Sequence, residues 1–176
     1  DRLRSRGLGD VYKRQGSGAI LVGFLYYCRD AVGVGVDIST EALKIAEENG
    51  QNLKITDRVE WRQGDYLKAF DEEDIFDGIF SNPPYIPTKD IGGLSREVKH
   101  EPRLALDGGT DGLYFYHLLA KGAAEHLKPG GFLAVEFGIG QATDILEMFR
   151  KSAQYEDFEV IKDYGGIERA LYCRKK

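Results

Sequence analysis

Four consecutive residues, Asn82-Pro83-Pro84-Tyr85, have the composition best suited to chemistry in this chain, and they follow an apolar run over residues 75–81. An amide or amino nitrogen is a poor nucleophile because its lone pair is delocalised. An Asn side-chain carbonyl and a main-chain carbonyl can each accept one of its hydrogens, which holds the lone pair toward an electrophile. The two prolines stiffen the loop and remove donors, and Tyr85 offers a flat face for stacking. The plain alternative is a turn that contains two prolines.

Three further groups suggest a nucleoside-binding site. Gly16-Ser17-Gly18 precedes an apolar segment, where glycines let a ligand approach the backbone and a helix N-terminus offers free N–H groups. Asp37 is suited to accept both hydroxyls of a ribose, and Asp65 with Tyr66 could hold the edge and face of an adenine. Each has a plain alternative: a helix-start loop, a capping or turn aspartate, and a strand-end turn. Together they predict an adenosine-type pocket that runs past Asn82.

Strands that alternate with helices must position these residues, and they predict a parallel sheet covered on both faces. In such sheets ligands bind at the carboxyl ends of the strands, where Asp37, Asp65, Asn82 and Glu136 are expected. Gly16-Ser17-Gly18 opens an apolar segment to Cys28 that we interpret as a helix, and Ser39 or Thr40 can cap the next helix. The other predicted elements are strands over 32–37, 58–62, 75–81 and 132–137, helices over 113–127 and 141–151, a long loop over 86–109, and a terminal ribbon formed by 158–163 and 170–174.

Composition restricts the function further. The 176 residues favour one domain, and a net charge of −5, from 24 basic and 29 acidic residues, argues against a surface that coats nucleic acid. Cys28 and Cys173 have no metal-ligand spacing and indicate no disulfide framework, so we expect no metal site and a cytoplasmic setting. The longest apolar run is too short to cross a bilayer, and no secretory signal is apparent.

The chain resembles the HemK-type protein-(glutamine-N5) methyltransferases, which modify peptide chain release factors. The resemblance covers essentially everything from Gly16 to the C-terminus. Asn82-Pro83-Pro84-Tyr85 alone is shared with adenine-N6 DNA methyltransferases, but the glutamine enzymes share much more. The shared stretches are Asn82 to Ile86, Leu94 to Val98, Glu101 to Leu113 with its Asp107-Gly108-Gly109-Thr110-Asp111-Gly112, Leu127 to Gly131, Glu136-Phe137-Gly138 with Gln141, and Asp163 with Gly166 and Arg169.

The resemblance implies a Rossmann-like α/β fold with a seven-stranded, mostly parallel sheet and a terminal antiparallel hairpin. It implies S-adenosylmethionine as methyl donor and a release factor as partner, with no membrane and no direct nucleic acid. Carried over by residue, the cofactor-binding set is Gly16, Ser17, Gly18, Asp37, Asp65, Tyr66 and Asn82. The catalytic residues are Asn82, Pro83 and Tyr85, and the loop Asn82, Pro83, Pro84 and Tyr85 holds the substrate glutamine amide.

The first fifteen residues depart from the family pattern. Members enter the glycine loop from an apolar strand as Asp-Leu-Gly-Thr-Gly-Ser-Gly, whereas Tyr12, Arg14 and Gln15 replace the acidic residue, the first glycine and the threonine here. Members also carry an N-terminal helical domain, which we expect to be absent here. We therefore expect 1–15 to be a non-native or disordered segment, 16–176 to be the methyltransferase domain of a truncated chain, and the first strand to be missing or damaged.

Two other functions stay open on the sequence. An adenine-N6 nucleic-acid methyltransferase would share the Asn82 loop, but it would need a basic groove and a target-recognition segment, and neither is apparent. A non-catalytic remnant would fold, or pair with a partner, without binding the cofactor, and the altered residues from Lys13 to Gln15 are its best support.

Overall fold

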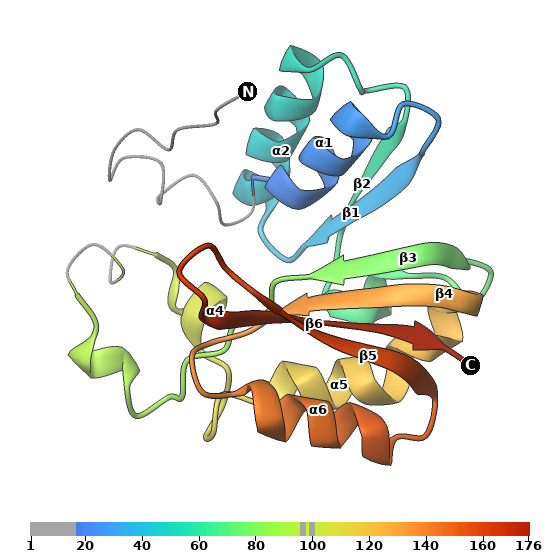
Figure 1. Cartoon of the computed structure of the whole chain (residues 1–176). Coiled ribbons are helices and arrows are strands. Elements are labelled where there is room, and N and C mark those ends of the chain that lie inside the picture. Colours follow the sequence, from blue (N-terminus) through green and yellow to red (C-terminus); the bar gives the residue numbers. More distant parts are fainter. Residues whose placement is uncertain (1–16, 96–97, 99–100) are drawn as a thin grey trace. The chain divides into compact units, whose positions relative to one another are not determined.

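The computed structural model describes residues 17–95, 98 and 101–176 (Figure 1). These residues form two compact units, the first ending at Ala69 and the second running from Phe70 to Lys176. Each unit has its own sheet and its own helices, so each is described by itself. The segment 1–15 and Gly16 lie outside the described residues, and the expectations for them stay predictions.

The first unit is a βαβ arrangement preceded by a helix. Strands β1 and β2 pair in parallel, with Gly35 opposite Trp61. Ser39 caps α2 as expected, because its Oγ accepts a hydrogen bond of 3.2 Å from the N–H of Ala42. The elements are α1 (Ala19–Tyr27), β1 (Gly33–Asp37), α2 (Thr40–Asn52), β2 (Val59–Gln63) and the 3₁₀ helix η2 (Tyr66–Ala69).

A small apolar core holds the first unit together. Val22 and Leu25 of α1 are buried with Ile55, and Trp61 packs against this cluster. The Arg58 guanidinium donates hydrogen bonds of 2.9 to 3.1 Å to the carbonyls of Leu25, Cys28 and Ala31. Arg58 therefore binds the Leu25 carbonyl in the last turn of α1 and two carbonyls in the segment that follows this helix.

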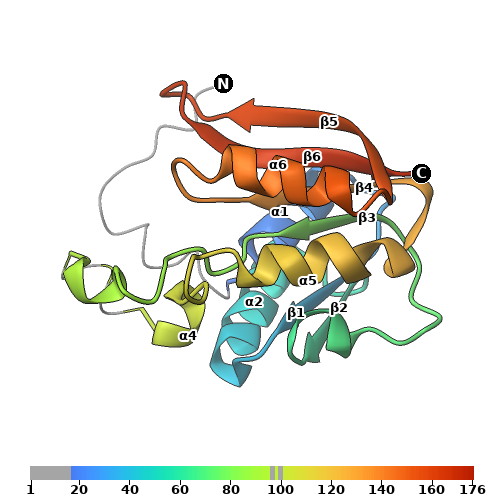
Figure 2. The ribbon, with the colours of Figure 1, turned by 90° about the horizontal axis from the view of Figure 1, so that it is seen from below.

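The second unit is a four-stranded sheet in the order β3-β4-β6-β5. Figures 1 and 2 both show α5 and α6 on the same face of this sheet. Strand β3 is parallel to β4, whereas β6 is antiparallel to both β4 and β5. The elements are β3 (Phe76–Ser81), η3 (Ile91–Gly93), α4 (Arg103–Leu106), α5 (Tyr114–Gly122), η4 (Ala123–His126), β4 (Leu127–Glu136), α6 (Ala142–Lys151), β5 (Tyr155–Lys162) and β6 (Glu168–Lys175).

The helix-covered face of this sheet forms the main core. Alternate residues of β4 point into it, so Leu133 and Val135 are buried while the residues between them are only half-buried. Tyr116 of α5 and Phe149 of α6 are fully buried against this face. The long segment between β3 and α5 leaves the sheet at the carboxyl ends of β3 and β4, as Figure 1 shows.

The α/β fold, the parallel pairs and the terminal antiparallel hairpin are confirmed. The expectation of seven strands is wrong for the described residues, which contain six strands in two hydrogen-bonded sheets. The stretch aligned with the family's first strand, around Tyr12 to Gln15, is polar and charged and lies outside the described residues. In the described part of the chain no helix is long and apolar enough to cross a membrane.

Candidate active site

Two of the predicted cofactor residues of the first unit, Ser17 and Gly18, lie at the N-terminus of α1. Gly18 adopts a left-handed conformation with φ of 65°, and a Cβ there would lie 2.6 Å from Cη2 of Trp61 and 2.9 Å from Cβ of Ala46. A side chain is therefore excluded by both the backbone and the packing. Ser17 is buried, and its Oγ has no hydrogen-bond partner among the described residues.

The N-terminus of α1 also lacks a side-chain cap. The first-turn N–H groups of a helix have no partner inside the helix, so here they remain available to an acceptor. With the unpaired Ser17 Oγ, they form a donor set on one short stretch of backbone. This donor set fits an anionic group such as a carboxylate.

Asp37 is the last residue of β1, as predicted. Its Oδ1 accepts a hydrogen bond of 2.8 Å from the N–H of Ser39, which is the turn and capping role of the plain alternative. Its Oδ2 has no partner in the described part of the chain, so one oxygen is still able to accept hydroxyl groups. The Asp37 carbonyl accepts from the N–H of Gly64 at 3.0 Å, which ties the ends of β1 and β2 together.

Asp65 and Tyr66 follow β2 at the same edge of this sheet. Asp65 is exposed, and its Oδ2 lies 2.6 Å from Nζ of Lys68. Its carbonyl accepts from the Lys68 N–H at 3.2 Å, so Asp65 also begins the η2 turn. Tyr66 has a positive φ of 58°, an uncommon conformation for an aromatic residue. The plain alternative of a strand-end turn is therefore also present at Asp65.

The Asn82 loop begins directly after β3 in the second unit. Asn82 is exposed, Pro83 is buried, and Pro84 and Tyr85 are half-buried. The side chain of Asn82 and the carbonyls of Pro83 and Pro84 have no hydrogen-bond partner among the described residues. The loop therefore presents several free acceptors and few donors, because its two prolines have no N–H.

The Tyr85 side chain is half-buried and lies near charged groups. Burial raises the pKa of the Tyr85 hydroxyl, the Glu136 carboxylate adds to this rise, Arg169 opposes it, and Glu101 adds a smaller rise. Burial also raises the pKa of the Glu101 carboxyl. Tyr85 is therefore a neutral phenol at physiological pH, able to stack on a planar group without adding charge.

Gln141 holds this loop in place, a role that the sequence did not reveal. Its Nε2 donates to the Tyr85 carbonyl at 3.0 Å and to the Gly112 carbonyl at 3.3 Å. Its Oε1 accepts from the N–H of Gly138 at 2.8 Å. Gly112 has a φ of 79°, and a Cβ there would collide with the Tyr85 carbonyl oxygen. The sequence places Gln141 only in a motif shared with the family. Its role could not be predicted, because hydrogen bonds to residues far away in the chain produce no periodic pattern.

Asp107 joins the glycine-rich segment to the chain after Tyr85. Its Oδ1 accepts hydrogen bonds from the Thr88 hydroxyl at 2.6 Å and from the Gly109 N–H at 3.1 Å. The Ile86 N–H and carbonyl pair with the Leu106 carbonyl and the Gly108 N–H, so the two segments form a short parallel bridge. The hydrogen bond from Thr88 is the largest cause that keeps the pKa of Asp107 below its usual value of 3.8, followed by that from Gly109.

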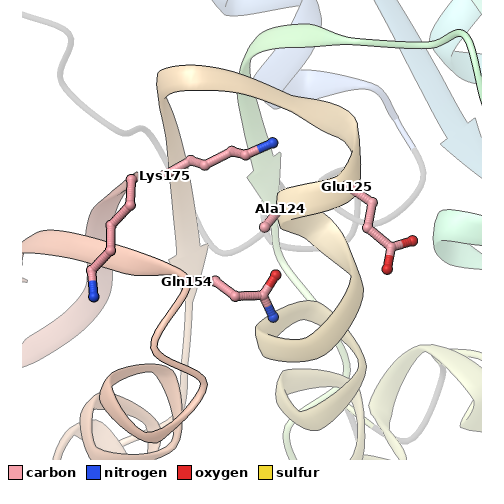
Figure 3. Close-up of a pocket in the computed structure, with 5 residues that line it drawn as sticks. Ala124, Glu125, Gln154 and Lys175 are labelled. Carbon is pink, nitrogen blue, oxygen red and sulfur yellow. The ribbon is translucent and has the colours of Figure 1, made fainter.

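Figure 3 shows a small pocket elsewhere in the second unit, with a volume of about 270 Å³. Ala124, Glu125, Gln154, Lys175 and Lys176 line it. The Nζ of Lys175 donates to the carbonyl of Leu127, the first residue of β4, at 2.7 Å, whereas Ser81 before the Asn82 loop pairs with Val135 near the carboxyl end of β4. This pocket therefore lies at the opposite end of the sheet from the predicted chemistry.

Each predicted site residue that the structure describes thus lies at a strand end or helix start, as expected. Ser17, Gly18, Asp37, Asp65 and Tyr66 lie in the first unit, and Asn82 to Tyr85 lie in the second. Their binding and catalytic roles stay predictions, and so does the role of Gly16.

Comparisons with known proteins give these positions a family context. The family model described as "RMKL-like, methyltransferase domain" matches residues 26–90, which include Asp37, Asp65 and the Asn82 loop. Among solved structures, a methyltransferase from Pyrococcus furiosus has a TM-score of 0.64 at 22% identity and covers 89% of this chain and 69% of its own. TrmN from Thermus thermophilus has a TM-score of 0.62 at 17% identity, covering 92% of this chain and 42% of its own. These likenesses show the methyltransferase α/β fold.

Sequence relatives are more specific. Release factor glutamine methyltransferase from Moorella thermoacetica is 41% identical over 161 residues, which is 92% of this chain and 56% of that protein. The protein of the same name from Bradyrhizobium diazoefficiens is 46% identical over 161 residues, 91% of this chain and 54% of that protein. The chain spans about half the length of these curated relatives. Over nine-tenths of its own length it is similar to the release factor glutamine methyltransferases, which confirms the resemblance found in its motifs.

Proposed function

We propose that this chain transfers a methyl group from S-adenosylmethionine to the side-chain amide nitrogen of a glutamine in a peptide chain release factor. The observation that carries the proposal is the acceptor array of the Asn82 loop. The Asn82 side chain and the carbonyls of Pro83 and Pro84 are unpaired among the described residues, while the next two carbonyls are occupied by Gln141 and Gly108. The relatives named above support glutamine as the amide that is modified.

In this proposal Asn82 and a proline carbonyl each accept one hydrogen of the substrate amide nitrogen. The carboxamide oxygen of Asn82 and the carbonyl of Pro83 or Pro84 then fix the direction of the nitrogen lone pair. Tyr85 stacks on the planar amide as a neutral phenol. The main contribution to rate is orientation, because the array makes the nitrogen meet the electrophile in line. No strong general base is required, since the methylated nitrogen becomes acidic and can lose its proton to water.

The first unit supplies the proposed cofactor residues. S-adenosylmethionine, when bound, provides the methyl group as an electrophilic sulfonium. The N-terminus of α1 with Ser17 and Gly18 holds its methionine carboxylate, with Gly16 expected beside them. The free Oδ2 of Asp37 accepts ribose hydroxyls, Asp65 and Tyr66 flank the adenine, and Asn82 contacts both cofactor and substrate. We place this reaction in the cytoplasm, with no direct role for nucleic acid.

The test begins with calorimetry of S-adenosylmethionine binding to the chain, followed by transfer to a release factor detected by mass spectrometry. We expect binding and a single methylated glutamine. Asn82→Ala should lower the turnover number by about 100-fold without changing the fold, because one of the two orienting acceptors is lost. Asn52→Ala is the matched control, because Asn52 is an exposed asparagine at the end of α2.

Three outcomes would contradict the proposal. Failure of the chain to bind S-adenosylmethionine would support a non-catalytic remnant. Transfer to adenine in DNA rather than to the release factor would support the nucleic-acid alternative. Unchanged turnover in Asn82→Ala would remove the role assigned to the acceptor array.

A further inference from the structure

Gln141 occupies a position where its side chain would ordinarily serve the helix. It is the N-cap residue of α6, yet its side chain makes no capping hydrogen bond. Helix N-caps favour Ser, Thr, Asp or Asn, whose side chains accept from the first-turn N–H groups and so stabilise the helix. The helix therefore forgoes this stabilisation, and the carboxamide is directed to other partners.

The partners of this carboxamide come from three separate segments of the second unit. Gly138 follows β4, Tyr85 follows β3, and Gly112 belongs to the glycine-rich segment before α5. All three contacts are to main-chain atoms, and both ends of the carboxamide are used. A carboxylate or a hydrocarbon of the same size could not donate to two carbonyls and accept from one N–H.

The contact with Tyr85 determines how the preceding prolines are presented. The peptide group that contains the Tyr85 carbonyl is planar, and the ring of each proline fixes its own φ. Few free torsions therefore remain between the Tyr85 carbonyl and the carbonyls of Pro83 and Pro84. A rotation of the Tyr85 carbonyl would turn these acceptors away from the substrate nitrogen.

We propose that Gln141 is a positioning residue for glutamine methylation, because its carboxamide fixes the Tyr85 carbonyl and thereby aims the acceptors of the Asn82 loop. This inference rests on the proposed function. The carboxamide of Gln141 bonds to main-chain atoms of the protein, so its loss should lower the turnover number far more than the affinity for S-adenosylmethionine, because most of the proposed cofactor contacts come from the first unit.

Gln141→Glu tests the donor specifically. The carboxylate keeps an acceptor for the Gly138 N–H but places negative charge against the Tyr85 and Gly112 carbonyls. Lowering the pH protonates the new carboxyl group, restores one donor, and should therefore raise the activity of the variant relative to wild type as the pH falls toward about 5. At neutral pH we expect a turnover number lower by between about 10-fold and 100-fold. Melting curves of the variant at the same pH values identify a folding defect, because such a defect would change the melting temperature together with the turnover number.

Gln154 provides a matched control. It lines the pocket in Figure 3, and its Nε2 also donates to two main-chain carbonyls, those of Ala120 at 3.4 Å and Lys121 at 3.2 Å. It lies at the opposite end of the sheet, so Gln154→Glu should leave turnover and its pH profile unchanged. An equal loss in both variants, or full activity of Gln141→Glu at neutral pH, would overturn the inference while the proposed function stands.

Amide exchange measured by NMR separates this inference from the proposed function. The Gly138 N–H should be protected in wild type and in Gln141→Glu, but should exchange faster in Gln141→Ala, because its acceptor Oε1 is lost. Unchanged exchange in Gln141→Ala would show that the Gln141 side chain does not hold the Gly138 N–H. If the Gly138 N–H is protected in a wild-type chain that transfers no methyl group, the Gln141 hydrogen bond is present but the proposed function is wrong. The positioning role of Gln141 would then be wrong as well.

Discussion

Gly112→Ala should damage the Asn82 loop more than any comparable glycine substitution. Gly112 has a φ of 79°, where an L-residue costs roughly 1–2 kcal/mol. A Cβ at this position would collide with the Tyr85 carbonyl oxygen and lie 2.8 Å from Nε2 of Gln141. Forcing the loop aside to relieve that overlap costs typically 1–3 kcal/mol, and losing the hydrogen bond from Gln141 to Tyr85 adds about 1 kcal/mol.

Gly130→Ala isolates the backbone part of this cost. Gly130 has a φ of 73°, but nothing lies within 4 Å of the place where its Cβ would be. Both variants share the left-handed penalty, so the difference between them, about 3 kcal/mol, measures contact with the loop. For a chain of this size, the melting temperature of Gly112→Ala should therefore lie about 6–12 °C below that of Gly130→Ala.

Circular dichroism melts of both variants and of wild type provide the assay, with methyl transfer measured at a temperature where all three are folded. Gly112→Ala should also lose turnover, because the Tyr85 carbonyl is displaced, whereas Gly130→Ala should keep it. Equal destabilisation in the two variants would show that the Gly112 contact does not constrain the loop. Full activity in a destabilised Gly112→Ala would show that the loop position does not govern transfer.

Three other outcomes are expected. Asp37→Asn should weaken S-adenosylmethionine binding by about 10-fold in calorimetry, because ribose hydroxyls lose a charged acceptor, and equal affinity would refute that role. Hydrogen bonds from the Ile167 N–H and then from Arg169 hold the pKa of Asp163 below its usual value of 3.8, so this carboxylate stabilises the fold at neutral pH and its contribution is lost as the pH falls through the lowered pKa. In an acid titration, Asp163→Asn should therefore lose less of its free energy of unfolding than wild type, and an identical acid transition in the two proteins would contradict this. A thiol reagent should modify exposed Cys28 quickly in the native chain but Cys173 only on unfolding, because burial raises the pKa of Cys173 to about 12; rapid labelling of both thiols would show that Cys173 is not buried.

Local patterns in the sequence predicted the elements, but not the points where tertiary structure overrides them. The helix expected over residues 113–127 ends at Gly122, because residues 123–126 tighten into a 3₁₀ turn and Leu127 already pairs with Phe76. The segment Lys128 to Gly131, which follows the expected helix directly, belongs to β4. The pairing of β4 with β3 determines where the helix ends and where the strand begins. A short stretch of sequence does not contain this information, because the two strands are far apart in the chain.

In the candidate site, too, the sequence indicated some residues but not others. Asp37, Asp65 and Asn82 could be located because each lies at or just after the end of a predicted strand, and the carboxyl ends of parallel strands have a known use. Gln141 could not be assigned a role, since its partners lie 56 and 29 residues away at Tyr85 and Gly112. A bond between a side chain and distant backbone leaves no periodicity in either segment. The expected first strand falls on residues before Ser17, which lie outside those that the structure describes.

The packing of Trp61 makes the glycine loop optically observable. Trp61 is the single tryptophan of the chain, and its ring lies directly against Gly18, where the absence of a side chain lets the two approach. Gly35 on β1 also leaves room for this ring. The tryptophan fluorescence of the protein, excited at a wavelength that its tyrosines do not absorb, therefore originates from one chromophore beside the proposed methionine site. A change in its emission spectrum on titration would report on the state of that loop without any label.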